Sequence, residues 1–152
     1  MTTLVSTAVA AVIAALNAGT PVSTQIARVR LRPMAQAQAQ AVVVRPLQSE
    51  VAETSLYPNL PVSWTSAISV ECYARSGVAT APDVALDSLV EAVYARLMAD
   101  PTLGGAVLSL QPQSLTWDFD ADGEQTACAA FVFTARQRAV AEHSLAILLG
   151  QA

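Results

Sequence analysis

The sequence contains no lysine, so all of its basic side chains are arginines. Charged residues make up 13% of the 152 residues and hydrophobic residues 53%, whereas a typical charged share is about 25%. The net charge of −4 argues against nucleic-acid binding as the main activity, because such proteins usually have a basic balance. It does not exclude DNA passing nearby. This composition predicts a folded chain with apolar surface that a partner covers.

Histidine and cysteine, which often act in catalysis or bind metals, are also scarce. The one histidine, His143, has no nucleophile or metal-ligand pattern around it. Cys72 and Cys128 lie far apart without a CxxC spacing, and we interpret them as small buried side chains. A disulfide between them would require neighbouring strands. There is no HExxH, GxSxG or glycine-rich phosphate loop. The sequence therefore predicts no enzyme and no cofactor.

The longest hydrophobic run is "LVSTAVAAVIAAL", residues 4–16. A signal peptide has basic residues before its hydrophobic run, and none precedes this one. The run is also shorter than the roughly 20 residues that cross a bilayer. We expect an amphipathic helix and no membrane segment. Thr2 or Thr3 would cap this helix, and Gly19 and Pro21 would end it. The chain length favours a single domain.

Two strand patterns follow. In "QIARVRLR" the apolar Ala27, Val29 and Leu31 alternate with Arg28, Arg30 and Arg32, which indicates a strand with one buried face. "VVVRP" predicts a short strand that ends at Pro46. We expect residues 33–41 to form a loop and residues 48–61 to form turns.

The clearest alternation covers residues 62–75 and predicts a long half-buried strand. A helix over residues 81–99 follows, with Thr80 and Asp83 as a capping box. Its expected core side chains are Leu86, Leu89, Val90, Val93 and Leu97. Asp83, Asp87 and Glu91 line up on the opposite face. They indicate a solvated face whose charges the helix dipole favours, more than an acidic catalytic site.

The turn "DPTLGG" leads into two more expected strands, residues 107–118 and 125–138. Phe131 and Phe133 lie on one face of the last strand, with Cys128, Ala130 and Val132 on the other. Such a strand is typical of a central position with both faces covered, one by another subunit. We therefore predict an α+β fold in which two main helices pack on one face of a mixed or antiparallel sheet of about four to five strands. Residues 1–138 would form the domain, and residues 139–152 an arm or short helix.

The aspartate run "DFDADG" raises the possibility of a cation site at Asp118, Asp120 and Asp122. These positions and Gly123 match the start of an EF-hand loop. The twelfth position is Ala129 instead of the required glutamate, and both flanks alternate as strands. We interpret the run as a hairpin tip, and a looser cation site stays a weak alternative.

Three segments together resemble a known family, the tail terminator proteins of long-tailed bacteriophages. They are "LPVSWTSAISVECYA" (residues 60–74), "APDVALDSLVEAVYARLMADPTLGG" (residues 81–105) and "LTWDFDADGEQTACAAFVFTARQR" (residues 115–138). In that family a corner of the LP type leads into a long strand. A helix that begins near an aspartate follows, then a turn and a closing hairpin. The first third of the chain matches in outline, and residues 139–152 have no counterpart.

The resemblance implies a structural protein of the virion, assembled in the host cytoplasm. Family members form a ring, typically of six subunits, at the head-proximal end of the tail tube. The ring stops tube polymerisation and offers a docking surface to the neck proteins of the head. DNA passes through its centre without sequence-specific binding. The partners would be other copies of the chain, the tube protein and a head-completion protein.

Other interpretations remain open. The chain could be another neck or head-completion component, the tube protein itself, a small cytoplasmic ligand-binding domain, or a calcium-dependent module. Arg28, Arg30 and Arg32 could meet Asp83, Asp87 and Glu91 across a subunit interface. They could equally face the lumen of a ring or water.

Overall fold

The computed structural model describes residues 3–23, 25–28, 40–53, 61–75, 82–119 and 126–140. Within these ranges lie two helices and five strands, in the order α1 Leu4–Asn17, β1 Ile26–Arg28, β2 Gln40–Glu53, β3 Pro61–Arg75, α2 Pro82–Met98, β4 Ser109–Phe119 and β5 Thr126–Val140. The strands form one sheet in the order β1-β2-β3-β5-β4. β1 runs parallel to β2, and all other neighbours are antiparallel. The predicted α+β class is confirmed.

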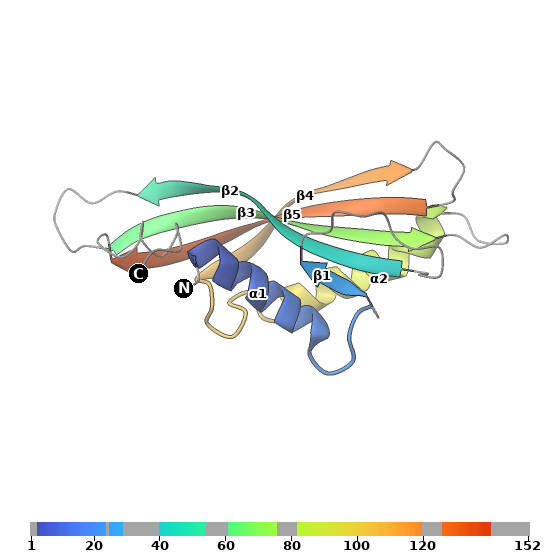
Figure 1. Ribbon diagram of the computed structural model, residues 1–152, viewed down its shortest axis with the longest axis horizontal. Helices are drawn as coiled ribbons and strands as arrows, with labels where there is room; N and C mark the ends of the chain where they lie inside the picture. Colours follow the sequence, from blue (N-terminus) through green and yellow to red (C-terminus); the bar gives the residue numbers. More distant parts are fainter. Residues whose placement is uncertain are drawn as a thin grey trace.

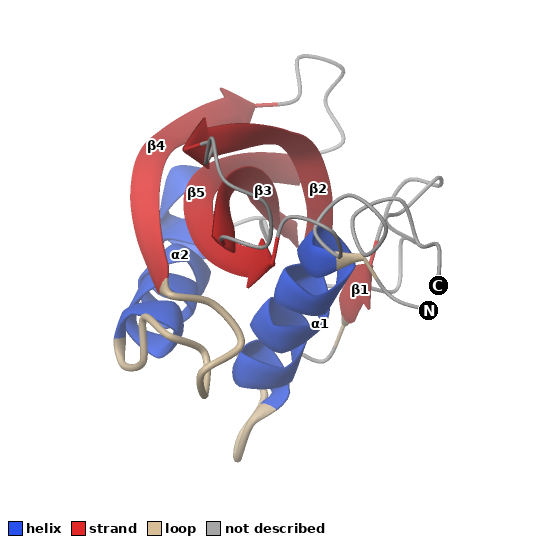
Figure 2. Ribbon diagram, turned by 90° about the vertical axis from the view of Figure 1, so that its left-hand side faces the viewer, coloured by secondary structure: helices blue, strands red, loops and turns tan. Residues whose placement is uncertain are grey.

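Both helices lie on the same face of the sheet (Figure 1). α1 packs over β1 and β2, whereas α2 packs over β3 and β5 and reaches β4. The long strands twist strongly and coil around one another when seen along the molecule (Figure 2). We call the surface under the helices the helix face and the opposite surface the far face.

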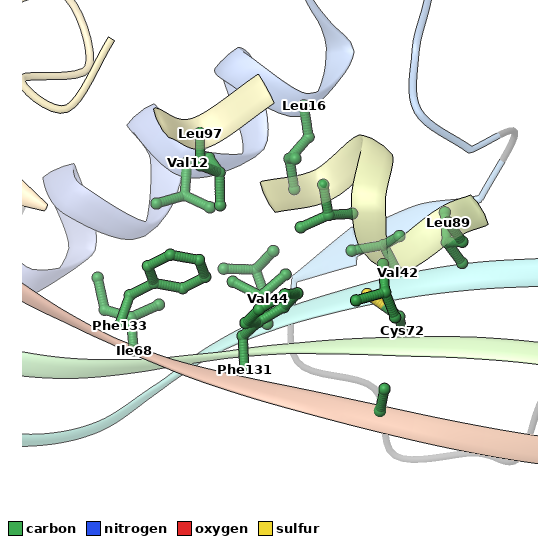
Figure 3. Packing of buried hydrophobic residues seen from close by; sticks show 14 of the residues in the cluster. Val12, Leu16, Val42, Val44, Ile68, Cys72, Leu89, Leu97, Phe131 and Phe133 are labelled. Atoms are coloured by element: carbon green, nitrogen blue, oxygen red, sulfur yellow. The ribbon is translucent and has the colours of Figure 1, made fainter. Parts of the chain in front are cut away.

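Side-chain alternation in the paired strands β3 and β5 forms the helix face. Ile68 lies opposite Phe133 in the register, and Val70 opposite Phe131. These four side chains are buried, and the labelled Ile68, Phe131 and Phe133 point toward the helices (Figure 3). Alternate residues of the same strands, such as Thr65 in β3, point to the far face. The predicted division of β3 and β5 into two faces is therefore confirmed.

The N-terminal helix forms as the sequence predicts. The Thr3 hydroxyl accepts a hydrogen bond from the Ser6 backbone amide at 3.0 Å, which caps the helix. Val9, Val12 and Leu16 are fully buried against the sheet. The chain leaves the helix through Gly19, whose φ of +62° favours glycine. No helix in the described part of the chain is long and apolar enough to cross a membrane.

The second helix also packs as expected. All five predicted core residues are buried: Leu86, Leu89, Val90, Val93 and Leu97. Thr80, the expected capping residue, lies outside the described residues.

Arg96 of α2 ties the two helices together, which the sequence did not predict. Its guanidinium donates hydrogen bonds to the carbonyls of Ala15 at 3.2 Å and Thr20 at 2.8 Å, and also to that of Ala18. These acceptors surround the C-terminus of α1, where backbone carbonyls lack helical partners and a positive charge is favourable.

The prediction that a strand ends at Pro46 is wrong. β2 continues through Pro46 to Glu53, so residues 48–53 are strand and not turn. Proline is tolerated here because β1 pairs with β2 only at residues 42–44, which leaves no second neighbour beside Pro46 among the described strands. The register with β3 shifts between Pro46 and Gln48, which is the mark of a β-bulge.

β5 lies inside the sheet, between β3 and β4, although β3 is the middle strand. Its predicted apolar faces differ in burial. Phe131 and Phe133 are buried under the helices, whereas Ala130 and Val132 are half-buried on the far face. Among the described residues, no helix packs on that face, so its cover by another subunit stays a prediction. β5 also extends to Val140, two residues past the expected domain end, while residues 141–152 lie outside the described part.

Candidate interaction surface

The three carboxylates of α2 lie where the sequence places them. Asp83, Asp87 and Glu91 follow one another at a spacing of four and are all exposed. Asp83 lies in the first turn of α2, where a negative charge interacts favourably with the helix dipole.

A groove separates the start of α2 from β4. It has a volume of about 420 Å³ and is lined by Asp83, Val84, Asp87 and Trp117. The Val84 side chain is 61% exposed and Trp117 is 39% exposed, although both are large and apolar. The groove therefore combines apolar walls with two carboxylates.

Apolar surface continues from this groove along the helix face. Leu115 of β4 lies opposite Phe131 of β5 in the register and is 37% exposed. Tyr94 of α2 stacks on Phe131 with ring centroids 6.1 Å apart, and 44% of Tyr94 remains exposed. We call the groove and these neighbours the α2–β4 surface; its residues are Asp83, Val84, Asp87, Tyr94, Leu115 and Trp117. Exposed apolar clusters with polar rims commonly mark interaction sites.

The arginines of the predicted basic strand lie away from these acids. Arg28 is exposed on β1 and donates a hydrogen bond to the Ser6 hydroxyl of α1. β1 and β4 are the opposite edges of the sheet, and β1 and α2 lie on opposite sides of the molecule in Figure 2. Arg30 and Arg32 lie outside the described residues. Within one copy, the structure does not bring Arg28 to the acids of α2.

The far face carries a polar network near its middle. Arg45 of β2 forms an ion pair with Glu71 of β3 at 2.7 Å. The hydroxyl of Tyr73 donates to the same carboxylate at 2.7 Å. Burial, together with this hydrogen bond to Glu71, raises the pKa of Tyr73, so the phenol stays protonated well above neutral pH. The Arg45 side chain is half exposed, which is typical of a surface ion pair.

The two cysteines are free thiols and point to opposite faces of the sheet. Tyr73 lies opposite Cys128, and Cys72 lies opposite Ala129, so Cys72 belongs to the helix face and Cys128 to the far face. Burial raises the pKa of Cys72 to about 12 and that of Cys128 to about 11. Nucleophilic cysteines have lowered pKa values, so neither thiol has the character of a catalytic nucleophile.

The turn between α2 and β4 is organised by Asp100. Its carboxylate accepts hydrogen bonds from the Thr102 hydroxyl at 2.7 Å and the Gly104 amide at 2.8 Å. These bonds, led by that from Thr102, lower the pKa of Asp100. Gly104 and Gly105 have φ values of +70° and +90°, a conformation that explains the two glycines of "DPTLGG".

The aspartate run receives little structural support as a cation site. Asp118 is exposed on β4, and Asp120 and Asp122 lie outside the described residues, as does His143. Among the described residues, no three or more His, Cys, Asp or Glu side chains lie close enough together to hold one metal ion. The candidate site therefore stays a prediction from sequence.

Comparison with known proteins finds a similarity in structure. No protein-family model matches the chain, and no curated protein matches it. The fold is similar to that of a chain from a solved structure described as "Virion of native gene transfer agent (GTA) particle", with 15% sequence identity and a TM-score of 0.49. The match covers 86% of this chain and 93% of that chain. A similarity of this size does not identify a function.

Sequence reasoning found the acids of this surface but missed its apolar part. Leu115 and Trp117 alternate with polar residues in β4, and a strand pattern alone assigns them to a buried face. They remain exposed because β4 is an edge strand that α2 only partly covers. Val84 and Tyr94 lie on the same side of α2 as the three acids, a pattern that could have indicated a mixed surface.

Proposed function

We propose that this protein is the tail terminator of a long-tailed bacteriophage. It would form a homo-oligomeric ring, of six subunits by the family resemblance, at the head-proximal end of the tail tube. The ring would stop tube polymerisation, present a joining surface to the neck protein and let DNA pass without sequence-specific contacts. The protein would thus be a structural component of the virion, without catalytic activity or cofactor.

One observation carries this proposal. The three segments that resemble the family follow one another along the chain as β3, α2 and the β4–β5 pair, and these elements pack together. The resemblance implied this order of elements from sequence motifs. The packing of these segments in one sheet and one core supports the proposal.

The exposed surfaces agree with assembly. The α2–β4 surface leaves four large apolar side chains partly exposed at one edge of the sheet. The far face has half-buried small residues that no described helix covers. The residues Arg28, Arg30 and Arg32 are proposed to lie at a subunit interface or in the lumen, and Asp83, Asp87 and Glu91 at an interface.

Negative-stain microscopy with mass photometry of the purified protein tests the proposal. We expect closed rings of uniform diameter whose mass is a fixed multiple of 15.8 kDa. Long tubes would instead identify a tube protein. Particles of monomer mass at every concentration would contradict the proposal and favour a ligand-binding domain.

A further inference from the structure

The described part of one copy of the chain leaves the α2–β4 surface exposed. Its groove exposes Val84 and Trp117 to solvent and holds two carboxylates, Asp83 and Asp87, beside them. Within the described parts of the chain, β4 pairs with β5 alone, so its other side offers backbone hydrogen-bonding groups to a further strand. Such edges are templates for strand addition unless something covers them.

The opposite edge of the same sheet carries a positive charge, whereas the α2–β4 surface carries two negative charges. β1 is the other edge strand among the described strands, and Arg28 is exposed at its end. The two edges lie on opposite sides of the molecule (Figure 2). Within one copy, β1 therefore cannot pair with β4, and Arg28 cannot reach Asp83 or Asp87.

We infer that the β1 edge of one copy, with Arg28, docks on the α2–β4 surface of the next copy, so that subunits associate head to tail. This inference rests on the proposed assembly into a ring and adds which surfaces meet. The Arg28 guanidinium would lie against Asp87 at the rim of the groove. β1 would extend the sheet beyond β4, and Trp117 and Val84 would lose their solvent exposure.

Charge decides between this arrangement and a symmetric one. A two-fold contact between two α2–β4 surfaces would bring the Asp83 and Asp87 carboxylates of both copies into one interface with no positive charge from that surface, and like charges across an interface are unfavourable. A contact between two different edges pairs opposite charges and buries both. Contacts of this kind produce closed rings or open filaments.

A charge exchange tests the pairing, with sedimentation velocity and mass photometry as the measurements. We expect Arg28→Glu and Asp87→Arg each to weaken self-association roughly tenfold or more. A mixture of these two variants should assemble again. In the mixture, the new glutamate of one variant meets the new arginine of the other, and the unchanged Arg28 meets the unchanged Asp87. A chain that carries both substitutions should assemble by itself.

Glu50→Arg is the matched control for the charge reversal. Glu50 is exposed on the far face, on the opposite side of the sheet from both Arg28 and the α2–β4 surface. This variant should associate as the wild type does, and unchanged circular dichroism and Tm should show that all variants are folded. Loss of assembly in Glu50→Arg of the same size would show a general effect of charge and would overturn the inference.

Trp117→Ser tests the apolar part in the same way. It should weaken association, whereas Leu108→Ser should not. Leu108 is 53% exposed but lies near the other end of β4, about 30 Å away along an extended strand.

Failure of this inference can be told from failure of the proposed function. Rings that form in Arg28→Glu and Asp87→Arg as in the wild type would refute the pairing and leave the ring intact. Rescue by the mixed variants with open filaments instead of rings would support the pairing and contradict a terminator. A wild-type protein that stays monomeric at every concentration would refute both.

Discussion

The two faces of the sheet differ in the type and burial of their side chains, although the same strands form both. On the helix face, large apolar side chains such as Phe133 and Ile68 are fully buried beneath α1 and α2. On the far face, the same strands carry small or polar side chains and the ion pair between Arg45 and Glu71. The helix face therefore supplies most of the folding free energy, because stabilisation by burial scales with apolar area.

Truncation of the core should give the largest effect and measure this difference directly. Phe133→Ala removes a fully buried ring, and we expect it to lower the free energy of unfolding by about 3–5 kcal/mol. Val132→Ala, one residue away on the far face, should lower it by only about 1 kcal/mol. Urea unfolding of both variants checks this. Similar losses would mean that the far face is as closely packed as the helix face.

The link between the two covering helices should matter next. Arg96→Met removes the charged hydrogen bonds to the end of α1, and we expect a loss of about 1–2 kcal/mol. Arg96→Lys should recover only part of it, because an ammonium group does not reproduce the guanidinium fork. Thermal unfolding measures both. Full recovery by lysine would show that charge near the helix C-terminus matters more than the geometry of the bonds.

The ion pair on the far face should have the smallest effect. A double-mutant cycle with Arg45→Met and Glu71→Gln should give a coupling energy of about 0.2–1 kcal/mol that decreases with added salt. Half of the Arg45 side chain is exposed, so solvent screens the pair. A coupling well above this range would show that the far face excludes water, and the contrast between the faces would be weaker than its composition indicates.

Local patterns in the sequence predicted much of the fold. Alternation located β3 and β5 and assigned their faces, and the helical spacing of five apolar residues identified the buried side of α2. These predictions succeeded because a side chain's direction depends only on the backbone period. The prediction at Pro46 failed because the tolerance of a strand for proline depends on whether a second strand lies beside it, which local sequence does not state.

In the candidate surface, too, local sequence predicted some features and not others. The exposure of Asp83, Asp87 and Glu91 was predicted from their spacing on α2, and that of Trp117 was missed. Whether an apolar residue in a strand is covered depends on the place of the strand in the sheet and on which helix lies over it.

By itself, the sequence determined the helices, most of the strands and the two faces of the central strands, because each follows from neighbours along the chain. It also determined the surplus of apolar residues over charges. The tertiary structure alone decided that β1 and β4 form opposite edges, that Arg96 of α2 binds the end of α1, and that Trp117 borders an acidic groove. These features arise from contacts between residues distant in sequence, whose pairing depends on the packing of the whole domain.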